Sequence, residues 1–269
     1  MNSISFEHYS SIPSEGHSSK GNQPKWERRG SWYKADHMGY EALAEVLIST
    51  LLKDSNVSDF VAYDPVLIQY DGKSVSGCSS KSFRKEGEIL ISFERLYRSY
   101  RGKSLAHELA RMDTREKIRY TVDFVESVTG LRGVGAYLTM ILELDAVFLN
   151  EDRHTNNLSV IRDETTGRYR LCPIYDNGLS LLSDLNDYPL GMDFYALIAK
   201  VRAKPFDREF DLQAEAAELL YHPQLRLRFN RQRVAEELSA LRDYYPDEIL
   251  SRAGNVLFEQ MRKYSFFFR

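Results

Sequence analysis

The fold expected of this chain is decided by the stretch Asn150-Glu151-Asp152-Arg153-His154-Thr155-Asn156-Asn157 and, nineteen residues after it, Asp176-Asn177-Gly178. The first stretch supplies a carboxylate at Asp152 and an amide oxygen at Asn157, and the second supplies another carboxylate at Asp176. Phosphoryl transfer needs one carboxylate to orient the attacking hydroxyl, and an amide oxygen with a second carboxylate to hold the magnesium that bridges the phosphates. The pattern therefore predicts a phosphoryl-transfer centre.

The residues around these stretches predict how they are brought together. Apolar residues at helical spacing predict a buried helix over Tyr137–Leu149, which delivers the first stretch as a loop at its C-terminal end. Two alternating runs, Leu158–Ile161 and Tyr169–Ile174, predict a hairpin through a turn that contains Gly167. Such a hairpin brings Asp176 back beside the loop.

Each of these residues also has an ordinary structural interpretation. Single Asp and Asn residues in loops are most often turn formers or caps. Arg153 and His154 alone are typical of a surface cation and a hydrogen-bonded imidazole, and Gly178 is expected to permit a tight turn after Asp176. The ordered set with a hairpin of suitable length is harder to explain by turns, and it favours the catalytic interpretation.

The motif D-R-H-x-x-N, followed by a hairpin and Tyr175-Asp176-x-Gly178, resembles that of the bacterial HipA-like serine/threonine kinases and, more distantly, that of the phosphoinositide kinases. The inverted order relative to H-R-D and D-F-G sets it apart from the common eukaryotic kinases. The resemblance implies an α+β, two-lobed kinase-like fold with a mixed β N-lobe and a mainly helical C-lobe. It implies Asp152 as catalytic base and Asn157 and Asp176 as magnesium ligands. Arg153 and His154 are implied as loop-shaping or phosphate-facing neighbours.

A small, polar segment near the N-terminus is a candidate phosphate loop for ATP. It contains Gly16, Ser18, Ser19 and Gly21, and its backbone N–H groups are suited to face an anion. It lacks the Lys-Ser or Lys-Thr that follows the second glycine of a Walker A loop. Since some HipA-like relatives are controlled there, Ser18 or Ser19 is a candidate for autophosphorylation.

A strand lysine and a helix glutamate follow this segment. Ser31–Asp36 is predicted to be a strand that carries Lys34, and an amphipathic helix begins near Gly39. By the order of the family, Lys34 is assigned to the phosphates and Glu41 to Lys34, with Glu45 one turn later as the competing choice. Lys25, in a Gln-Pro-Lys that also occurs in HipA-like sequences, is the rival lysine.

The segment Glu88–Leu96 is predicted to be an apolar strand that runs into a charged turn where the two lobes join, with backbone groups near Ile91 and Phe93 facing adenine. This divides the chain into an ATP-binding N-lobe over residues 1–94 and a helical C-lobe over 95–269. Helical spacing is found in the segments Tyr97–Ala110, Arg115–Thr129, Arg208–Leu220, Arg231–Tyr244 and Asp247–Tyr264. The aromatic segment Tyr188–Phe210 is expected to be an activation or substrate segment, or a connecting loop packed on the helices.

Composition restricts the classes of function. The 269 residues carry a net charge of −3 with Lys and Arg spread throughout, which argues against nucleic-acid binding. No apolar run is long enough to cross a bilayer and no signal peptide is evident, so we expect a cytoplasmic protein without membrane contact. Cys78 and Cys172 lie far apart without metal-ligand spacing, which favours free thiols.

The leading hypothesis is therefore an ATP- and Mg²⁺-dependent serine/threonine protein kinase that phosphorylates a protein substrate. The resemblance also implies a separately encoded small regulatory partner, as in some shortened relatives. Two alternatives stay open from the sequence: a kinase for a small molecule or a lipid headgroup with the same centre, and a nucleotide-binding pseudokinase.

Overall fold

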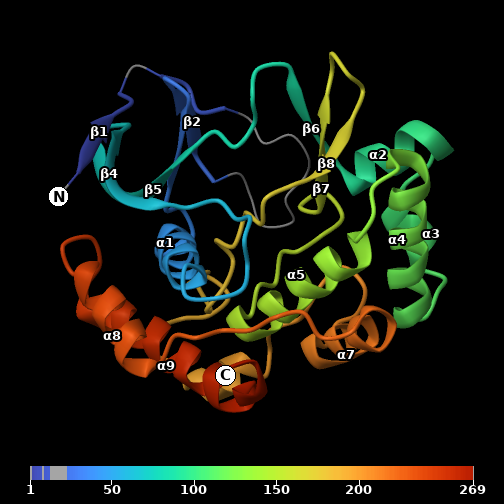
Figure 1. Ribbon diagram of the computed structural model, residues 1–269. Coiled ribbons are helices and arrows are strands. Elements are labelled where there is room, and N and C mark those ends of the chain that lie inside the picture. Colours follow the sequence, from blue (N-terminus) through green and yellow to red (C-terminus); the bar gives the residue numbers. More distant parts are fainter. Residues whose placement is uncertain (1, 8, 13–22, 269) are drawn as a thin grey trace.

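The computed structural model describes residues 2–7, 9–12 and 23–268, and its described elements fall into two parts (Figure 1). The N-terminal part is a five-stranded mixed sheet with one helix. The strand order is β1-β4-β5-β3-β2, and β1 pairs parallel to β4 while the other pairs are antiparallel. The elements are β1 (Ser3–Ser5), β2 (Lys25–Arg28), β3 (Ser31–Ala35), α1 (Glu41–Leu52), β4 (Asp64–Tyr70) and β5 (Lys73–Lys81).

Helix α1 lies between the first sheet and the helices of the C-terminal part (Figure 1). All its residues except Thr50 are buried, and apolar side chains occur all round it. A helix that is apolar on every side must be covered on every side. Helix α1 is therefore fixed, and the two glutamates that it carries, Glu41 and Glu45, are held inside the protein.

The C-terminal part contains a three-stranded antiparallel sheet of order β6-β7-β8 and the remaining helices. Its elements are β6 (Glu88–Ser92), α2 (Phe93–Arg101), α3 (Leu105–Leu109), α4 (Thr114–Thr129), α5 (Val134–Phe148), β7 (Ser159–Asp163), β8 (Tyr169–Leu171), α6 (Phe194–Ile198), α7 (Phe210–Tyr221), α8 (Arg231–Ala240), α9 (Asp247–Lys263) and the 3₁₀ turn η1 (Ser265–Phe267). Because β6 pairs with β7, it joins the sheet that also carries the predicted hairpin.

The predicted helix, loop and hairpin around residues 137–176 are confirmed. Helix α5 begins slightly earlier than predicted and ends at Phe148, where Leu149 takes a left-handed conformation with φ 57°. Strands β7 and β8 form the hairpin, and Gly167, with φ 69°, lies in its turn.

Two predicted elements between residues 88 and 110 are corrected. In place of the charged turn predicted after the strand, α2 begins directly at Phe93, because the Ser92 side chain accepts the backbone N–H of Arg95 and caps the helix. The single helix predicted over Tyr97–Ala110 is two helices. Gly102, with φ 69°, ends the first, and the Ser104 side chain caps the second.

No helix in the described part of the chain is both long enough and apolar enough to cross a membrane.

Candidate active site

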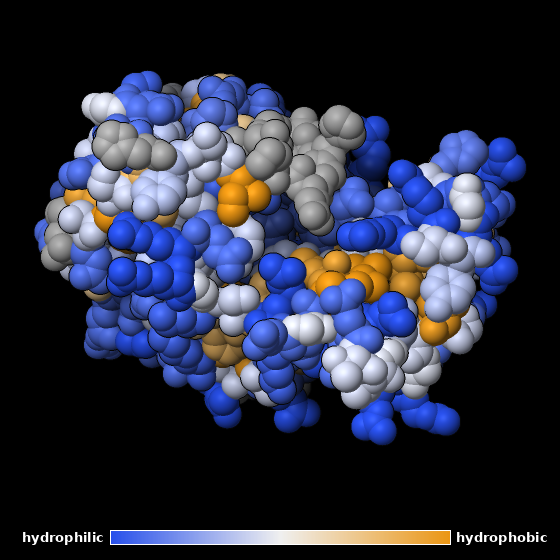
Figure 2. All heavy atoms as spheres, turned by 90° about the horizontal axis from the view of Figure 1, so that it is seen from above, coloured by the Kyte–Doolittle hydropathy of each residue, from blue (hydrophilic) through white to orange (hydrophobic). Residues whose placement is uncertain are grey.

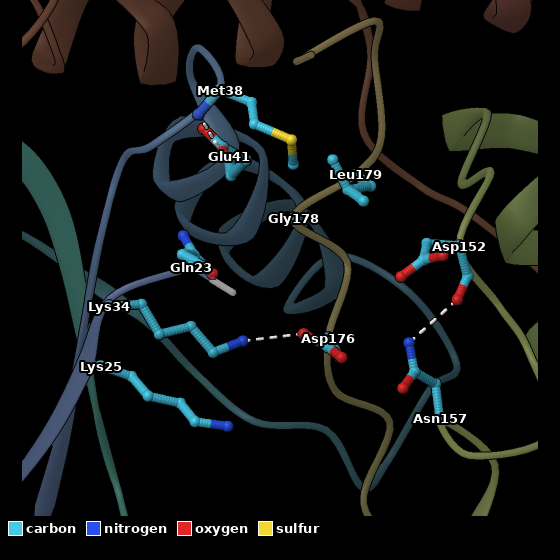
Figure 3. A pocket seen from close by; sticks show the side chains of 10 residues that line it. All are labelled: Gln23, Lys25, Lys34, Met38, Glu41, Asp152, Asn157, Asp176, Gly178 and Leu179. Carbon is cyan, nitrogen blue, oxygen red and sulfur yellow. Dashed lines mark hydrogen bonds and ion pairs between the residues drawn. The ribbon is translucent and has the colours of Figure 1, made fainter. Parts of the chain in front are cut away.

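The predicted site residues collect at the cleft between the two parts. Figure 2 shows the surface hollowed there, with apolar side chains beside the hollow. The space between the walls measures about 610 Å³, including the part open to solvent. The residues that line it are Gln23, Lys25, Lys34, Met38, Glu41, Asp152, Asn157, Asp176, Gly178 and Leu179 (Figure 3).

Two lysines enter the cleft from the first sheet. Lys25 on β2 lies directly opposite Lys34 on β3 in the antiparallel register. Side chains of directly opposed residues point to the same face of a sheet. Both lysines therefore reach the cleft, and Figure 3 shows them extending from one side toward Asp176, with Asp152 and Asn157 on the other side. The rival candidates of the sequence are neighbours in one site.

The carboxylate that pairs with Lys34 is that of Glu45. Lys34 Nζ lies 2.6 Å from Glu45 Oε1 and 2.9 Å from Asp176 Oδ1. The assignment of Glu41 to Lys34 is thus wrong. The Glu41 carboxylate instead accepts the backbone N–H groups of Met38 at 2.8 Å and Gly39 at 3.0 Å, just before α1.

The charged side chains of the cleft shift one another's pKa values so that each stays in its charged form. Burial acts to lower the pKa of Lys34, but the carboxylates of Asp176 and Glu45 outweigh it and hold that pKa well above its ordinary value. Burial acts to raise the pKa of Asp176, but Lys34, with smaller contributions from Arg153 and Lys25, lowers it to about 2. Lys34 is therefore a cation and Asp176 an anion at neutral pH.

The loop after α5 presents Asp152 and Asn157. Asn150 Oδ1 accepts the backbone N–H of Asp152, and the Asn157 side-chain amide donates to the backbone carbonyl of Asp152 at 2.9 Å. This bond occupies the nitrogen of the Asn157 amide and leaves its oxygen for the cleft. The Asp152 side chain is only 11% exposed, and its Oδ1 lies 3.2 Å from Lys204 Nζ. His154 Nε2 lies 3.7 Å from Asp152 Oδ2.

Arg153 has a structural position. Its side chain is 1% exposed, and its guanidinium donates to Asp145 on α5. It also donates to the Tyr175 carbonyl and to Asn177 Oδ1, both at 2.7 Å. Of the two roles that the resemblance left open for Arg153, the structure places it as the loop-shaping residue, because its donors face buried acceptors and it does not line the cleft.

The turn around Asp176 differs from the prediction. Asp176 itself is left-handed, with φ 62°, whereas Gly178 is not. The interpretation of Gly178 as the residue that permits the turn is therefore wrong. A Cβ at Gly178 would lie 3.4 Å from the Glu41 Cβ, which is an ordinary van der Waals contact with α1. A left-handed non-glycine residue is uncommon, and such residues occur at functional sites.

The oxygens of Asn157 and Asp176 are suited to magnesium. Mg²⁺ prefers oxygen ligands and commonly takes one or two from side chains, with phosphates and water completing its shell. In the described part of the chain, no group of three or more His, Cys, Asp or Glu side chains has a metal-binding arrangement. One amide and one carboxylate at a phosphate site do not require such a group, so the residues fit a magnesium ion that arrives with a nucleotide.

Other predicted site residues lie apart from these. Gly16, Ser18, Ser19 and Gly21 lie outside the described residues. Ile91 pairs with Val160 in the second sheet. Phe93 is fully buried, and its backbone N–H donates to the Leu158 carbonyl, so that N–H is not available to adenine. Neither residue lines the cleft.

Sequence reasoning missed several residues at the site. Lys204 contacts Asp152 from 52 positions away, and Met38 and Leu179 line the cleft. None of the three belongs to a spaced motif, and of them only Lys204 lies in the aromatic segment Tyr188–Phe210. Gln23, which also lines the cleft, is the glutamine of the Gln-Pro-Lys that contains Lys25.

No protein-family model matches the chain, and no curated protein matches its sequence. Among solved structures, the chain is similar to the Helicobacter pylori proinflammatory kinase CtkA, with a TM-score of 0.61 and 13% identity over 97% of this chain and 94% of that one. It is also similar to a chain of the Shewanella oneidensis MR-1 toxin–antitoxin complex of HipA, HipB and operator DNA. There the TM-score is 0.47 and the identity 11%, over 97% of this chain and 67% of that one.

At such identities the likeness to CtkA shows the fold. The protein has the α+β, two-lobed fold of the kinase CtkA, with a mixed sheet in the N-lobe and a mainly helical C-lobe, and the predicted fold class is confirmed.

Proposed function

We propose that the protein is an ATP- and magnesium-dependent serine/threonine protein kinase of HipA-like type. One observation carries the proposal. Lys34 on β3, Asp152 and Asn157 in the loop after α5, and Asp176 after β8 come from three separate segments of the chain and line one cleft. A fold needs no such convergence for its stability, and the four side chains are those that phosphoryl transfer requires. The fold is shared with a solved kinase, which agrees with this assignment.

Asp152 would orient the hydroxyl of a protein serine or threonine. The hydroxyl oxygen forms a bond to the γ-phosphorus while the bond from that phosphorus to the bridging oxygen of ADP breaks, and the hydroxyl proton passes to the Asp152 carboxylate. Lys34, held by Glu45, would meet the phosphate oxygens from the first sheet. Asn157 and Asp176 would hold magnesium, which, when bound, neutralises phosphate charge.

The two lobes would have different roles. Residues 1–94 would bind ATP, with Gly16, Ser18, Ser19 and Gly21 over the phosphates. The apolar side chains beside the hollow suit a base (Figure 2). Residues 95–269 would supply the catalytic loop and the acceptor site.

Transfer of labelled γ-phosphate from Mg-ATP tests the proposal. The wild type, Asp152→Asn and the control Asp123→Asn are compared, with the protein itself and a general serine/threonine substrate as acceptors. Asp123 lies exposed on α4, so its substitution removes the same charge away from the cleft. We expect label on serine or threonine with the wild type and the control, and a loss of about 10²–10⁴-fold with Asp152→Asn.

Two other outcomes would each point to a different conclusion. Magnesium-dependent ATP binding without label on protein would point to a small-molecule or lipid-headgroup kinase, or to a pseudokinase. Equal labelling by the wild type and Asp152→Asn would contradict the assigned base.

A further inference from the structure

Lys204 lies against the proposed catalytic base. Its Nζ is 3.2 Å from Asp152 Oδ1, and the two side chains are 37% and 11% exposed. An ion pair between exposed side chains on a protein surface contributes little, often under about 1 kcal/mol, and such pairs form by chance. This pair differs because its acidic partner, Asp152, is nearly buried at the centre of the site.

The backbone around Lys204 is held in place. Ala203 and Phe206 on either side are buried, and Ala203 N–H donates to the Arg208 carbonyl. Lys117 on α4 donates to the Phe206 carbonyl at 2.9 Å. Its neighbour Thr114 hydrogen bonds to Asp207. The segment that follows Lys204 is therefore tied to α4.

The earlier half of the same segment is tied down as well. The Tyr188 hydroxyl donates to Glu151 Oε2 at 2.6 Å, directly beside Asp152 in sequence. Arg252 on α9 donates to the carbonyls of Pro189, Leu190 and Met192. Because both halves are anchored, the ammonium of Lys204 is delivered to Asp152 by a fixed backbone.

A second cation at the cleft would be able to neutralise charge that Lys34, already paired, does not. Lys34 already lies within 3 Å of two carboxylates, Glu45 at 2.6 Å and Asp176 at 2.9 Å. Transfer of a phosphoryl group spreads negative charge over its oxygens next to the acceptor hydroxyl. That hydroxyl is oriented by Asp152, so a cation beside Asp152 is within reach of the oxygens that carry the charge.

We propose that Lys204 is a further catalytic residue, which moves from Asp152 Oδ1 to the transferring phosphoryl group and neutralises it. This inference rests on the proposed kinase function. Lys204 stays protonated throughout and donates hydrogen bonds, while the acceptor proton passes to Asp152 and the electron pair of the broken bond to ADP. Its departure from Oδ1 also leaves that oxygen for the acceptor hydroxyl.

Steady-state kinetics test the role in catalysis. Lys204→Met removes the charge and keeps most of the apolar stem, Lys204→Arg keeps the charge, and Lys200→Met is the matched control on an exposed site of the same segment. We expect Lys204→Met to lower kcat about 10²–10³-fold, as the loss of one preorganised donor does, with KM for ATP within about threefold. Lys204→Arg should recover part of kcat, and Lys200→Met should match the wild type.

A chemical footprint tests the contact with the γ-phosphoryl group without turnover. Acetylation of Lys204 in the wild type is measured by mass spectrometry with Mg-ADP and with a non-hydrolysable Mg-ATP analogue. We expect slower labelling of Lys204 with the ATP analogue than with ADP, and equal labelling of Lys200.

The two measurements separate the possible failures. If the wild type transfers phosphate and Lys204→Met keeps its kcat, the inference is overturned and the kinase function stands. A lower kcat with equal labelling under both nucleotides would make Lys204 a positioning residue for Asp152 and would also overturn the inference. A wild type that binds no Mg-ATP would refute the proposed function and this inference with it.

Discussion

The buried ion pair between Arg153 and Asp145 offers the sharpest test of how the site is held together. Both side chains are 1% exposed, and Arg153 Nε lies 3.0 Å from Asp145 Oδ2. Arg153→Leu removes the cation and leaves the Asp145 carboxylate buried without its partner. Breaking such a pair costs about 3–5 kcal/mol of unfolding free energy, chiefly because an uncompensated charge is left behind.

The double variant Arg153→Leu, Asp145→Leu separates the charge from the contacts. It removes both ions, and replacing a buried pair by apolar side chains is often neutral. The double variant still lacks the hydrogen bonds that Arg153 donates to the Tyr175 carbonyl and to Asn177 Oδ1, and the one that Asp145 accepts from the Asn150 side chain. These lost hydrogen bonds should cost about 2 kcal/mol together. The double variant should therefore be more stable than the single one by about 1–3 kcal/mol.

Urea unfolding followed by far-ultraviolet circular dichroism measures these differences. Burial outweighs the effect of Arg153 and raises the pKa of Asp145 even in the wild type. Without Arg153 the pKa of Asp145 in the folded state should rise further. The folded protein should then keep a proton on Asp145 at pH values where the unfolded chain has already released it. Stability of the single variant should then fall as the pH rises from about 4 toward neutrality. The double variant should lack this dependence.

Activity should respond differently from stability. Arg153 connects the loop that carries Asp152 to the segment that carries Asp176, so both variants should lose most phosphoryl transfer. Two results would refute the reasoning: a single variant within about 1 kcal/mol of the wild type, or a double variant no more stable than the single one.

Four further predictions rest on other contacts. Glu45→Gln should lower kcat/KM at least tenfold in the transfer assay, because Lys34 loses the carboxylate that lies 2.6 Å away; unchanged kinetics would contradict the pairing. Burial raises the pKa of Glu143 to about 8, so the folded chain holds the extra proton and stability should fall from about pH 5 through pH 8. Glu143→Gln should flatten that profile in denaturation experiments. The free energy of unfolding of Gly178→Ala should lie within about 1 kcal/mol of the wild-type value, because the added Cβ makes only ordinary van der Waals contacts. Gly39→Ala should be far less stable, because its Cβ would lie 2.1 Å from a backbone carbonyl.

Local signals in the sequence predicted the centre of the fold well. The helix that ends at Phe148 and the hairpin of β7 and β8 were predicted because apolar periodicity and a turn glycine act within a few residues. The helix break at Gly102 was missed because apolar spacing continues across it. Ser104 reads as a cap only once the chain is known to turn there.

Contacts between distant segments account for most of what the sequence did not reveal. Lys204 reaches Asp152 because Phe206 and Asp207 are fixed on α4, and no motif near residue 204 records this. Lys25 and Lys34 looked like rivals along the chain, yet the register of β2 and β3 places them opposite one another. Strand register depends on the whole sheet, so spacing along the sequence cannot give it.

The pairing of Lys34 with Glu45 follows from the chemistry of a helix start. The first backbone N–H groups of a helix, and those of the turn before it, lack partners within the helix and attract acceptors. Glu41 lies at the first position of α1, and its carboxylate accepts the N–H groups of Met38 and Gly39. Glu45, one turn later, has no such demand on Oε1 and is free to turn it to the strand lysine. An acidic residue in the first turn is thus better assigned to the helix start, and the lysine to the acidic residue one turn further on.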